Sequence, residues 1–183
     1  MMKLERPAAP QFLKENYKIW GKEYKRTSRF RWKKYKKVLQ ALKEASHNHC
    51  SFCDGYPIGG TAREIEHFRP RESFPLLAFV WENLFYCCSL CNKKKGRRFS
   101  RKLLKPDKAE YSFEKFFIYS YANGIISPNP RCSVEDKERA ETTIEFYGLN
   151  DYDRPEARVE AWEGFLDANN PNKEKRPYRF ILR

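Results

Sequence analysis

The sequence predicts a small α+β protein in which two short strands and a helix assemble around metal, with helices on either side and a second hairpin. Three observations predict this fold. Apolar residues recur at three- and four-residue steps over residues 11–25 and again over residues 32–42, as on the buried face of a helix. Two Cys-x-x-Cys pairs enclose short, turn-rich segments. Asn123-Gly124, a favoured pair for a two-residue hairpin turn, lies between two β-prone runs.

Composition and charge limit the class of protein. The 183 residues allow one domain of ordinary size, and 40% apolar and 16% aromatic residues support a sizeable core. The net charge is +13, and the excess of positive charge is in the N-terminal and central parts of the chain. Residues 1–45 carry 14 Lys/Arg against 4 Asp/Glu, residues 46–105 carry 11 against 5, and residues 106–183 carry 12 against 15. A basic front part suits a polyanion, because Lys and Arg release the counterions condensed on phosphates.

Two helices are expected in the basic N-terminal region, residues 1–46. The first covers residues 11–25, and Thr27 and Ser28 are suited to cap the second. The apolar stripe of the second helix consists of Trp32, Tyr35, Val38, Leu39 and Leu42. Its lysines lie largely off that stripe and form either a solvated face or a phosphate-contacting face.

The central segment, residues 47–105, is expected to hold the strand–strand–helix unit. Glycines and prolines after Cys50 indicate turns. Residues 61–68 are predicted as a short strand, and residues 81–87 as its antiparallel partner. A helix is expected to start near Cys91.

The last segment, residues 106–183, is expected to form an α/β extension packed on that unit. Ser133 and Asp136 resemble a capping box ahead of one helix, and another helix begins near residues 153–155. Because the segment is acidic overall, it is a candidate surface for docking a protein partner.

The thiols of the two pairs match the pattern of a closed, structural zinc site; they are Cys50, Cys53, Cys88 and Cys91. The N-terminus lacks the apolar region of a secretory signal, and no stretch approaches the roughly 20 apolar residues of a membrane span. We therefore expect a cytoplasmic, reducing compartment, where such pairs hold metal more often than disulfides. Cys87 competes with Cys88 as the third ligand, although only Cys88 has the two-residue spacer to Cys91.

A carboxylate and an imidazole are adjacent at the expected end of the first strand. Successive strand side chains point to opposite sides, so one of Glu66 and His67 can bind a metal ion while the other addresses a water. Asn83 and Asn92 follow, in the second strand and after the last cysteine. Phosphodiester hydrolysis needs an activated nucleophile and neutralisation of charge, which one His and one metal ion supply.

Together, CSFCD, REIEHFRPR and WENLFYCCSLCNKKKG, within residues 50–96, resemble the motif of HNH endonucleases. The resemblance implies a ββα-metal HNH core and hydrolysis of DNA phosphodiester bonds. It implies His67 as the general base, Glu66 and Asn92 as ligands of Mg²⁺ or Mn²⁺, and Asn83 as the residue that orients His67 or holds the connecting loop. The third motif position is Asn92 instead of His, and its neutral oxygen suits these hard cations.

Basic residues flank this motif on both sides and are expected to contact nucleic-acid phosphates. They are Arg69, Arg71, Lys93, Lys94, Lys95, Arg97 and Arg98. The HNH resemblance implies that Lys95 lies close to the reacting phosphate.

The flanking segments add a narrower resemblance, to the HNH component of Septu anti-phage systems and to HNH proteins found with retrons. FPLLAFVWENLFYCCSLCN, LLKPD and TIEFYGLN carry it beyond the motif itself. The resemblance implies a nuclease effector that works in a defence complex with an SMC/OLD-like ATPase subunit.

Two other interpretations stay open. RNA, including transfer RNA, is an alternative substrate, because no base-reading element is evident. The other is a zinc-stabilised nucleic-acid-binding module without catalysis. A homodimer is a further expectation, since one metal site per chain cuts two strands more easily in two copies.

Overall fold

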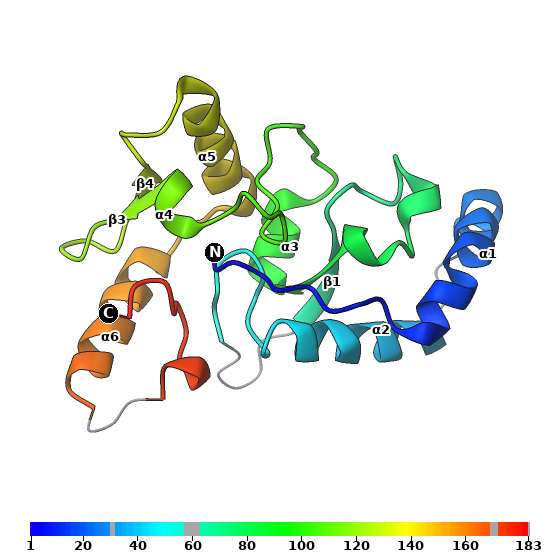
Figure 1. The fold of residues 1–183 in the computed structure, drawn as a ribbon, viewed down its shortest axis with the longest axis horizontal. Coiled ribbons are helices and arrows are strands. Elements are labelled where there is room, and N and C mark those ends of the chain that lie inside the picture. The colour runs from blue at the N-terminus through cyan, green and yellow to red at the C-terminus, as the bar shows by residue number, and fades with distance from the viewer. Residues whose placement is uncertain (30–31, 57–62, 169–171, 183) are drawn as a thin grey trace.

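The computed structural model describes residues 1–29, 32–56, 63–168 and 172–182. The described chain is a mixed α+β structure with two antiparallel hairpins, each of two short strands. Figure 1 shows an elongated molecule, with helix α1 at one end and helix α6 toward the other. The first hairpin and helix α3 lie between them.

Two helices form the N-terminal region, as predicted. Helix α1 (Gln11–Thr27) ends at Ser28, whose left-handed backbone (φ 54°) lets its N–H donate to the Tyr24 carbonyl. Thr27 is the last residue of α1 and Ser28 terminates it, so the expectation that these residues cap the second helix is wrong. Helix α2 (Trp32–Ala45) buries Val38 and Leu42 of its expected stripe. The side chains of residues 32–35 are outside the described part of the chain.

The central hairpin positions the residues of interest. Strand β1 (Arg63–His67) pairs antiparallel with strand β2 (Leu84–Cys88), and His67 lies opposite Leu84. Helix α3 (Ser89–Lys95) follows β2 directly and contacts both strands. Gly96, with φ 55°, ends that helix. The chain thus forms two strands and a helix in the predicted order.

Two details of this hairpin differ from the expectation. Residues 61 and 62 of the expected first strand lie outside the described residues. The expected second strand starts later, because Trp81–Asn83 form the 3-10 helix η2, in which the Asn83 N–H donates to the Val80 carbonyl. A second 3-10 turn, η1 (Pro75–Leu77), packs on α1 in the loop between the strands.

The C-terminal part contains the second hairpin and two longer helices, as predicted. Its elements are α4 (Phe113–Phe116), β3 (Phe117–Tyr119), β4 (Ile126–Pro128), α5 (Val134–Tyr147), α6 (Arg154–Leu166) and η3 (Lys173–Lys175). The Ser133 hydroxyl caps α5 by accepting from the Asp136 N–H, and Gly148 ends that helix. The local signals for these helices are therefore confirmed.

The turn between β3 and β4 is longer than the predicted two-residue turn. Ser120 donates its N–H to the Ile125 carbonyl, and its own carbonyl accepts from Gly124. Gly124 has φ 71°, and a Cβ there would collide with the backbone of Pro155. The tight approach of the turn to the start of α6 therefore requires glycine.

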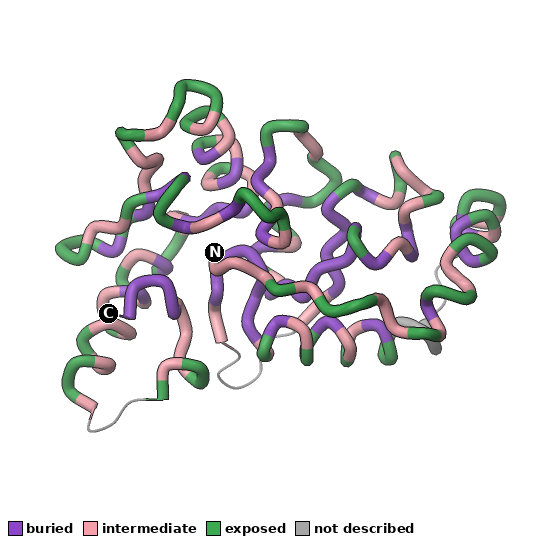
Figure 2. The backbone as a smooth tube through the Cα atoms, viewed as in Figure 1, coloured by how far each residue is buried: buried purple, intermediate pink, exposed green. Residues whose placement is uncertain are grey.

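Strand β2 separates two hydrophobic cores by the alternation of its side chains. Leu84 and Tyr86 pack into a core formed with α1 and α2. Phe85 and Cys87 pack into the other, which includes Phe52, the cysteine pairs and residues of α5. Figure 2 shows buried segments in the middle of the molecule, where Figure 1 places β1 and α3.

The predicted division into residues 1–46, 47–105 and 106–183 stays a prediction. No helix within the described ranges is long and apolar enough to span a bilayer.

Candidate metal centre and adjoining cleft

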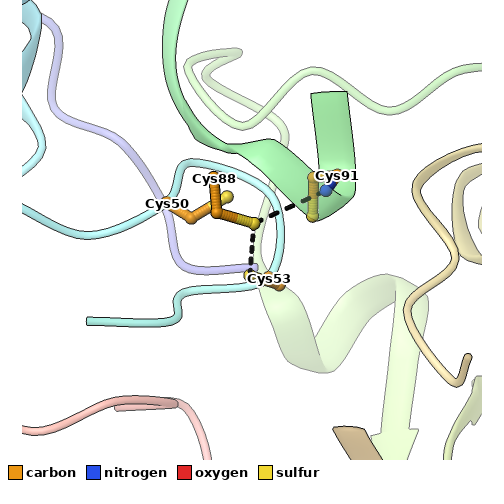
Figure 3. A group of neighbouring side chains, drawn as sticks. All are labelled: Cys50, Cys53, Cys88 and Cys91. Carbon is orange, nitrogen blue, oxygen red and sulfur yellow. Dashed lines mark hydrogen bonds between the residues drawn. The ribbon is translucent and has the colours of Figure 1, made fainter. Parts of the chain in front are cut away.

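The four cysteines of the two pairs come together in one buried cluster (Figure 3). All are free thiols, and their sulfur atoms lie within 4.8 Å of one another. The Sγ atoms of Cys53 and Cys88 are 3.8 Å apart. Zn–S bonds of about 2.3 Å in a tetrahedron require sulfur atoms about 3.8 Å apart. The cluster is therefore consistent with a structural zinc site.

Hydrogen bonds to sulfur support this arrangement. The Gly55 N–H donates to Cys53 Sγ at 3.4 Å, and the Cys91 N–H donates to Cys88 Sγ at 3.5 Å. These bonds stabilise thiolates, the form that binds metal.

A buried cation from the C-terminal part also reaches the cluster. Arg154, the first residue of α6, donates to Cys91 Sγ at 3.4 Å. Burial alone would lower the pKa of Arg154, but the neighbouring cysteines, Cys91 foremost, raise it. The guanidinium can thus offset part of the negative charge of four thiolates.

Cys88, and not Cys87, belongs to the group of four. Hydrogen bonding with Cys50 lowers the pKa of the Cys88 thiol to about 4. Burial instead raises the pKa of the Cys87 thiol well above its usual value, although its Sγ lies 3.9 Å from Cys50 Sγ. The alternative left open by the sequence is resolved in favour of Cys88, in agreement with the two-residue spacer.

Glu66 sits at the base of a cleft beside the cluster, on the face of β1 that meets α3. Its carboxylate forms an ion pair with the Lys95 ammonium, and both side chains are almost completely buried. Burial raises the pKa of Glu66 to about 7, although Lys95 lowers it. Lys95 also donates to the His67 carbonyl at 2.9 Å. Lys95 was expected to contact phosphate, but only 1% of this residue is exposed, so its ammonium instead supports the strand end.

His67 points toward the loop between the strands. Its Nε2 lies 3.0 Å from the Ala78 carbonyl oxygen. Because a carbonyl can only accept, Nε2 carries the proton of the neutral ring and Nδ1 is the basic nitrogen. Burial, helped by the charge of Arg71, lowers the pKa of His67 to about 4. The imidazole is therefore neutral near pH 7.

Asn83 makes three hydrogen bonds within the loop that carries Ala78. Its Oδ1 accepts from the Arg69 N–H at 2.8 Å, while its Nδ2 donates to the carbonyls of Arg69 (3.0 Å) and Leu77 (3.1 Å). Of the two roles expected for Asn83, these contacts correspond to holding the connecting loop.

Asn92 projects from α3 toward β1, where its Nδ2 donates to the carboxylate of Glu64. Glu64 is not among the site residues predicted from the sequence. The available signal was its spacing, because a residue two positions before Glu66 in a strand shares its face.

One cleft, of about 560 Å³, joins the groups at the strand end. Glu64, Glu66, His67 and Asn92 line it, together with the basic residues Arg71, Lys93 and Arg97. We call this the acidic–basic cleft.

The remaining basic residues predicted to bind phosphate lie elsewhere. Lys94 pairs with Asp151 at 2.5 Å, and Arg98 pairs with Glu145 at 3.1 Å. Arg69 lines a different cleft. The structure thus divides the predicted set, and only three of its seven members reach the acidic–basic cleft.

The fold and the site define the class of protein. It is a small mixed α+β protein with a buried four-cysteine cluster that is consistent with a structural zinc site. Beside the cluster lies a cleft lined by carboxylate, imidazole, amide and basic groups. No family model matches the chain.

The chain is homologous to Septu protein PtuB, which confirms the Septu part of the narrower resemblance. It is 28% identical to Septu protein PtuB of Bacillus thuringiensis over 169 residues, covering 84% of this chain and 56% of that protein. It is 26% identical to Septu protein PtuB of Bacillus mycoides (strain KBAB4) over 124 residues, covering 54% of this chain and 42% of the relative. The chain spans about half the length of these relatives.

Proposed function

We propose that this protein is a metal-dependent endonuclease with an HNH-type ββα-metal core, which hydrolyses phosphodiester bonds of DNA. The acidic–basic cleft carries the proposal. It gathers an imidazole, an amide oxygen and three carboxylates, those of Glu64, Glu66 and Glu72, beside β1 and α3. Three cationic side chains surround them, and one of these, Arg71, pairs with Glu72 at 3.3 Å. The order β1–β2–α3, held beside the cysteine cluster, supports the same core.

The donor set of the cleft fits a hard divalent cation. Glu66 and Asn92 would hold Mg²⁺ or Mn²⁺, and Glu64, which is bonded to Asn92, lies within the same set. Carboxylate and amide oxygens are the ligand types these ions prefer. When bound, the ion supplies neutralisation of the charge on the reacting phosphate and the leaving oxygen.

His67 takes the proton from the attacking water in this proposal. The Ala78 carbonyl holds the ring by Nε2, so Nδ1 accepts the proton, and the same carbonyl then stabilises the imidazolium. Asn83 keeps Ala78 in place indirectly, by donating to the carbonyl of Leu77, which precedes Ala78, and to the carbonyl of Arg69 near the start of the loop. Arg71, Lys93 and Arg97 hold the phosphates that flank the reacting one.

The homology to Septu protein PtuB supports a role for this nuclease as the effector of an anti-phage complex. An SMC/OLD-like ATPase subunit is then the expected partner. The acidic segment, residues 106–183, remains the candidate docking surface, because its charge differs from that of the basic nuclease part. A truncation before Ser133 that still co-purifies with the ATPase would exclude this surface.

A cleavage assay tests the proposed activity. The full chain, alone and together with a candidate ATPase partner, is incubated with plasmid DNA or total RNA in Mg²⁺. We expect cleavage of DNA, and a loss of about 10²–10⁴-fold in rate for His67→Ala. His47→Asn is the matched control, because His47 is exposed and outside the cleft. Cleavage of RNA alone would support the alternative substrate, and wild-type rates in His67→Ala would exclude His67 as the base.

A further inference from the structure

A second cleft of about 520 Å³ opens next to the acidic–basic cleft. The first cleft is lined by His67, Pro70 and Arg71. The second is lined by Phe68 and Arg69, which lie between His67 and Pro70 in the sequence. Its basic side chains are Arg69, Arg101, Lys105, Lys108 and Arg139. Two acidic residues, Glu82 and Glu110, also line it, so positive charge predominates. We call it the basic cleft.

Arg69 is held in this cleft in a way that suits a phosphate ligand. Its guanidinium lies over the rings of Phe99 (5.4 Å) and Phe74 (5.7 Å). Asn83 bonds the N–H and the carbonyl of Arg69, so the backbone is held as well. A planar guanidinium stacked on aromatic rings keeps its N–H donors directed outward, which favours bidentate contact with phosphate.

The positive charge of the basic cleft is only partly neutralised. Lys105 pairs with Asp107 at 3.4 Å, and Arg139 pairs with Asp136 at 3.2 Å. Arg101 and Lys108 are exposed and form no ion pair within the described part of the chain. Exposed, unneutralised cations in a groove attract a polyanion, because binding releases condensed counterions.

We propose that the basic cleft binds the sugar–phosphate backbone of the DNA duplex that is cut in the acidic–basic cleft. This inference rests on the proposed function and adds a second contact for the same substrate. Arg69 is two residues from His67, so their Cα atoms are separated by at most about 7 Å. That is about the rise of two base pairs along the axis of a DNA duplex, at about 3.4 Å each. One duplex can therefore reach both clefts.

Binding without cleavage tests this inference. The full chain carrying His67→Ala is titrated into a labelled DNA duplex without divalent cations, from about 50 to 200 mM salt. Adding Arg101→Gln and Lys108→Gln should weaken binding about tenfold and reduce the slope of log affinity against log salt by about 2. Arg131→Gln with Lys175→Gln removes the same charges from exposed positions outside both clefts and should leave the slope unchanged.

The outcomes separate this inference from the proposed function. If the Arg101/Lys108 variant binds like the Arg131/Lys175 control, or if the parent protein does not bind the duplex, the basic cleft is not a DNA contact. If binding depends on Arg101 and Lys108 but the protein with intact His67 never cuts nucleic acid in Mg²⁺, the basic cleft stands and the nuclease proposal fails. If cutting occurs and the Arg101/Lys108 variant cuts and binds like the control, only the basic cleft is excluded.

Discussion

The cysteine cluster and the acidic–basic cleft are neighbours, but their polar groups are arranged differently. In the cluster, four buried sulfur atoms lie within 4.8 Å of one another, and those of Cys53 and Cys88 are 3.8 Å apart, which is consistent with a tetrahedral zinc site. In the cleft, the groups bond to each other: Glu66 pairs with Lys95, and Asn92 donates to Glu64. The comparison indicates that the cluster holds the fold together, whereas the cleft combines structural contacts with groups available for chemistry.

The largest effect is expected from removing a cluster ligand. Cys88→Ser should lose bound zinc and the cooperative unfolding transition, because metal binding contributes on the order of 10 kcal/mol to folding in small zinc domains. Cys87→Ser is the matched control and should keep zinc, since Cys87 lies outside the group of four. Zinc content and thermal unfolding measure both. Zinc loss in Cys87→Ser with retention in Cys88→Ser would reverse the assignment.

Lys95→Met tests whether the base of the cleft is structural. Removing the buried ammonium leaves the Glu66 carboxylate without its partner, which should lower the free energy of unfolding by about 3–5 kcal/mol. Adding Glu66→Gln should restore part of that loss, because the buried charge is then removed. Denaturant unfolding measures both variants, with Lys94→Met as the control. Equal stability of Lys95→Met and Lys94→Met would contradict the buried ion pair.

Arg154→Gln tests the link between α6 and the cluster. Without the cation beside Cys91, zinc affinity should fall by about 10–100-fold, as for other groups that support metal ligands. Arg154→Lys keeps the charge and should lie between this variant and the wild type. Competition with a chromogenic chelator measures the affinity. Identical affinity in all three proteins would show that Arg154 only bonds the end of α5.

The smallest effects are expected from substituting two adjacent lysines of α3, Lys93 and Lys94. Lys94 is paired with Asp151 at the surface, so Lys94→Gln should change the free energy of unfolding by no more than about 1 kcal/mol and leave DNA binding nearly unchanged. Lys93 lines the acidic–basic cleft, so Lys93→Gln should reduce the salt dependence of binding by about one phosphate contact. Salt titrations of both variants measure the difference, and equal slopes would contradict the division of the basic residues.

Much of the local structure followed from sequence signals. The apolar spacing of residues 11–25 predicted α1, and the Ser133–Asp136 capping box predicted the start of α5. The Asn123-Gly124 signal predicted the second hairpin but not its longer turn. That turn depends on contact with Pro155, which is distant in sequence. Local signals identify elements well, whereas turn geometry also responds to packing.

Prediction of the candidate site from the sequence has the same limit, because contacts between residues distant in the sequence are not visible in it. The adjacency of Glu66 and His67 was visible in the sequence, and strand alternation predicted their divergence. The burial of Lys95 was not predictable, because a lysine within a basic run is normally solvated. Glu64 was not predicted because its role depends on a contact between residues that are distant in the sequence. It bonds to Asn92, which lies in a helix that begins 25 residues after Glu64.

The sequence by itself determined the four cysteines, the Glu66-His67 pair and the order of strand, strand and helix. These features depend on residue type and short spacing, which act locally. Only the tertiary structure decided that Cys88 joins the cluster, that Lys95 turns inward, and that three of the seven predicted phosphate-binding residues reach the acidic–basic cleft. Each of these depends on which residues, distant in the sequence, lie nearby in the fold, because burial and pairing energies are set by neighbours in space.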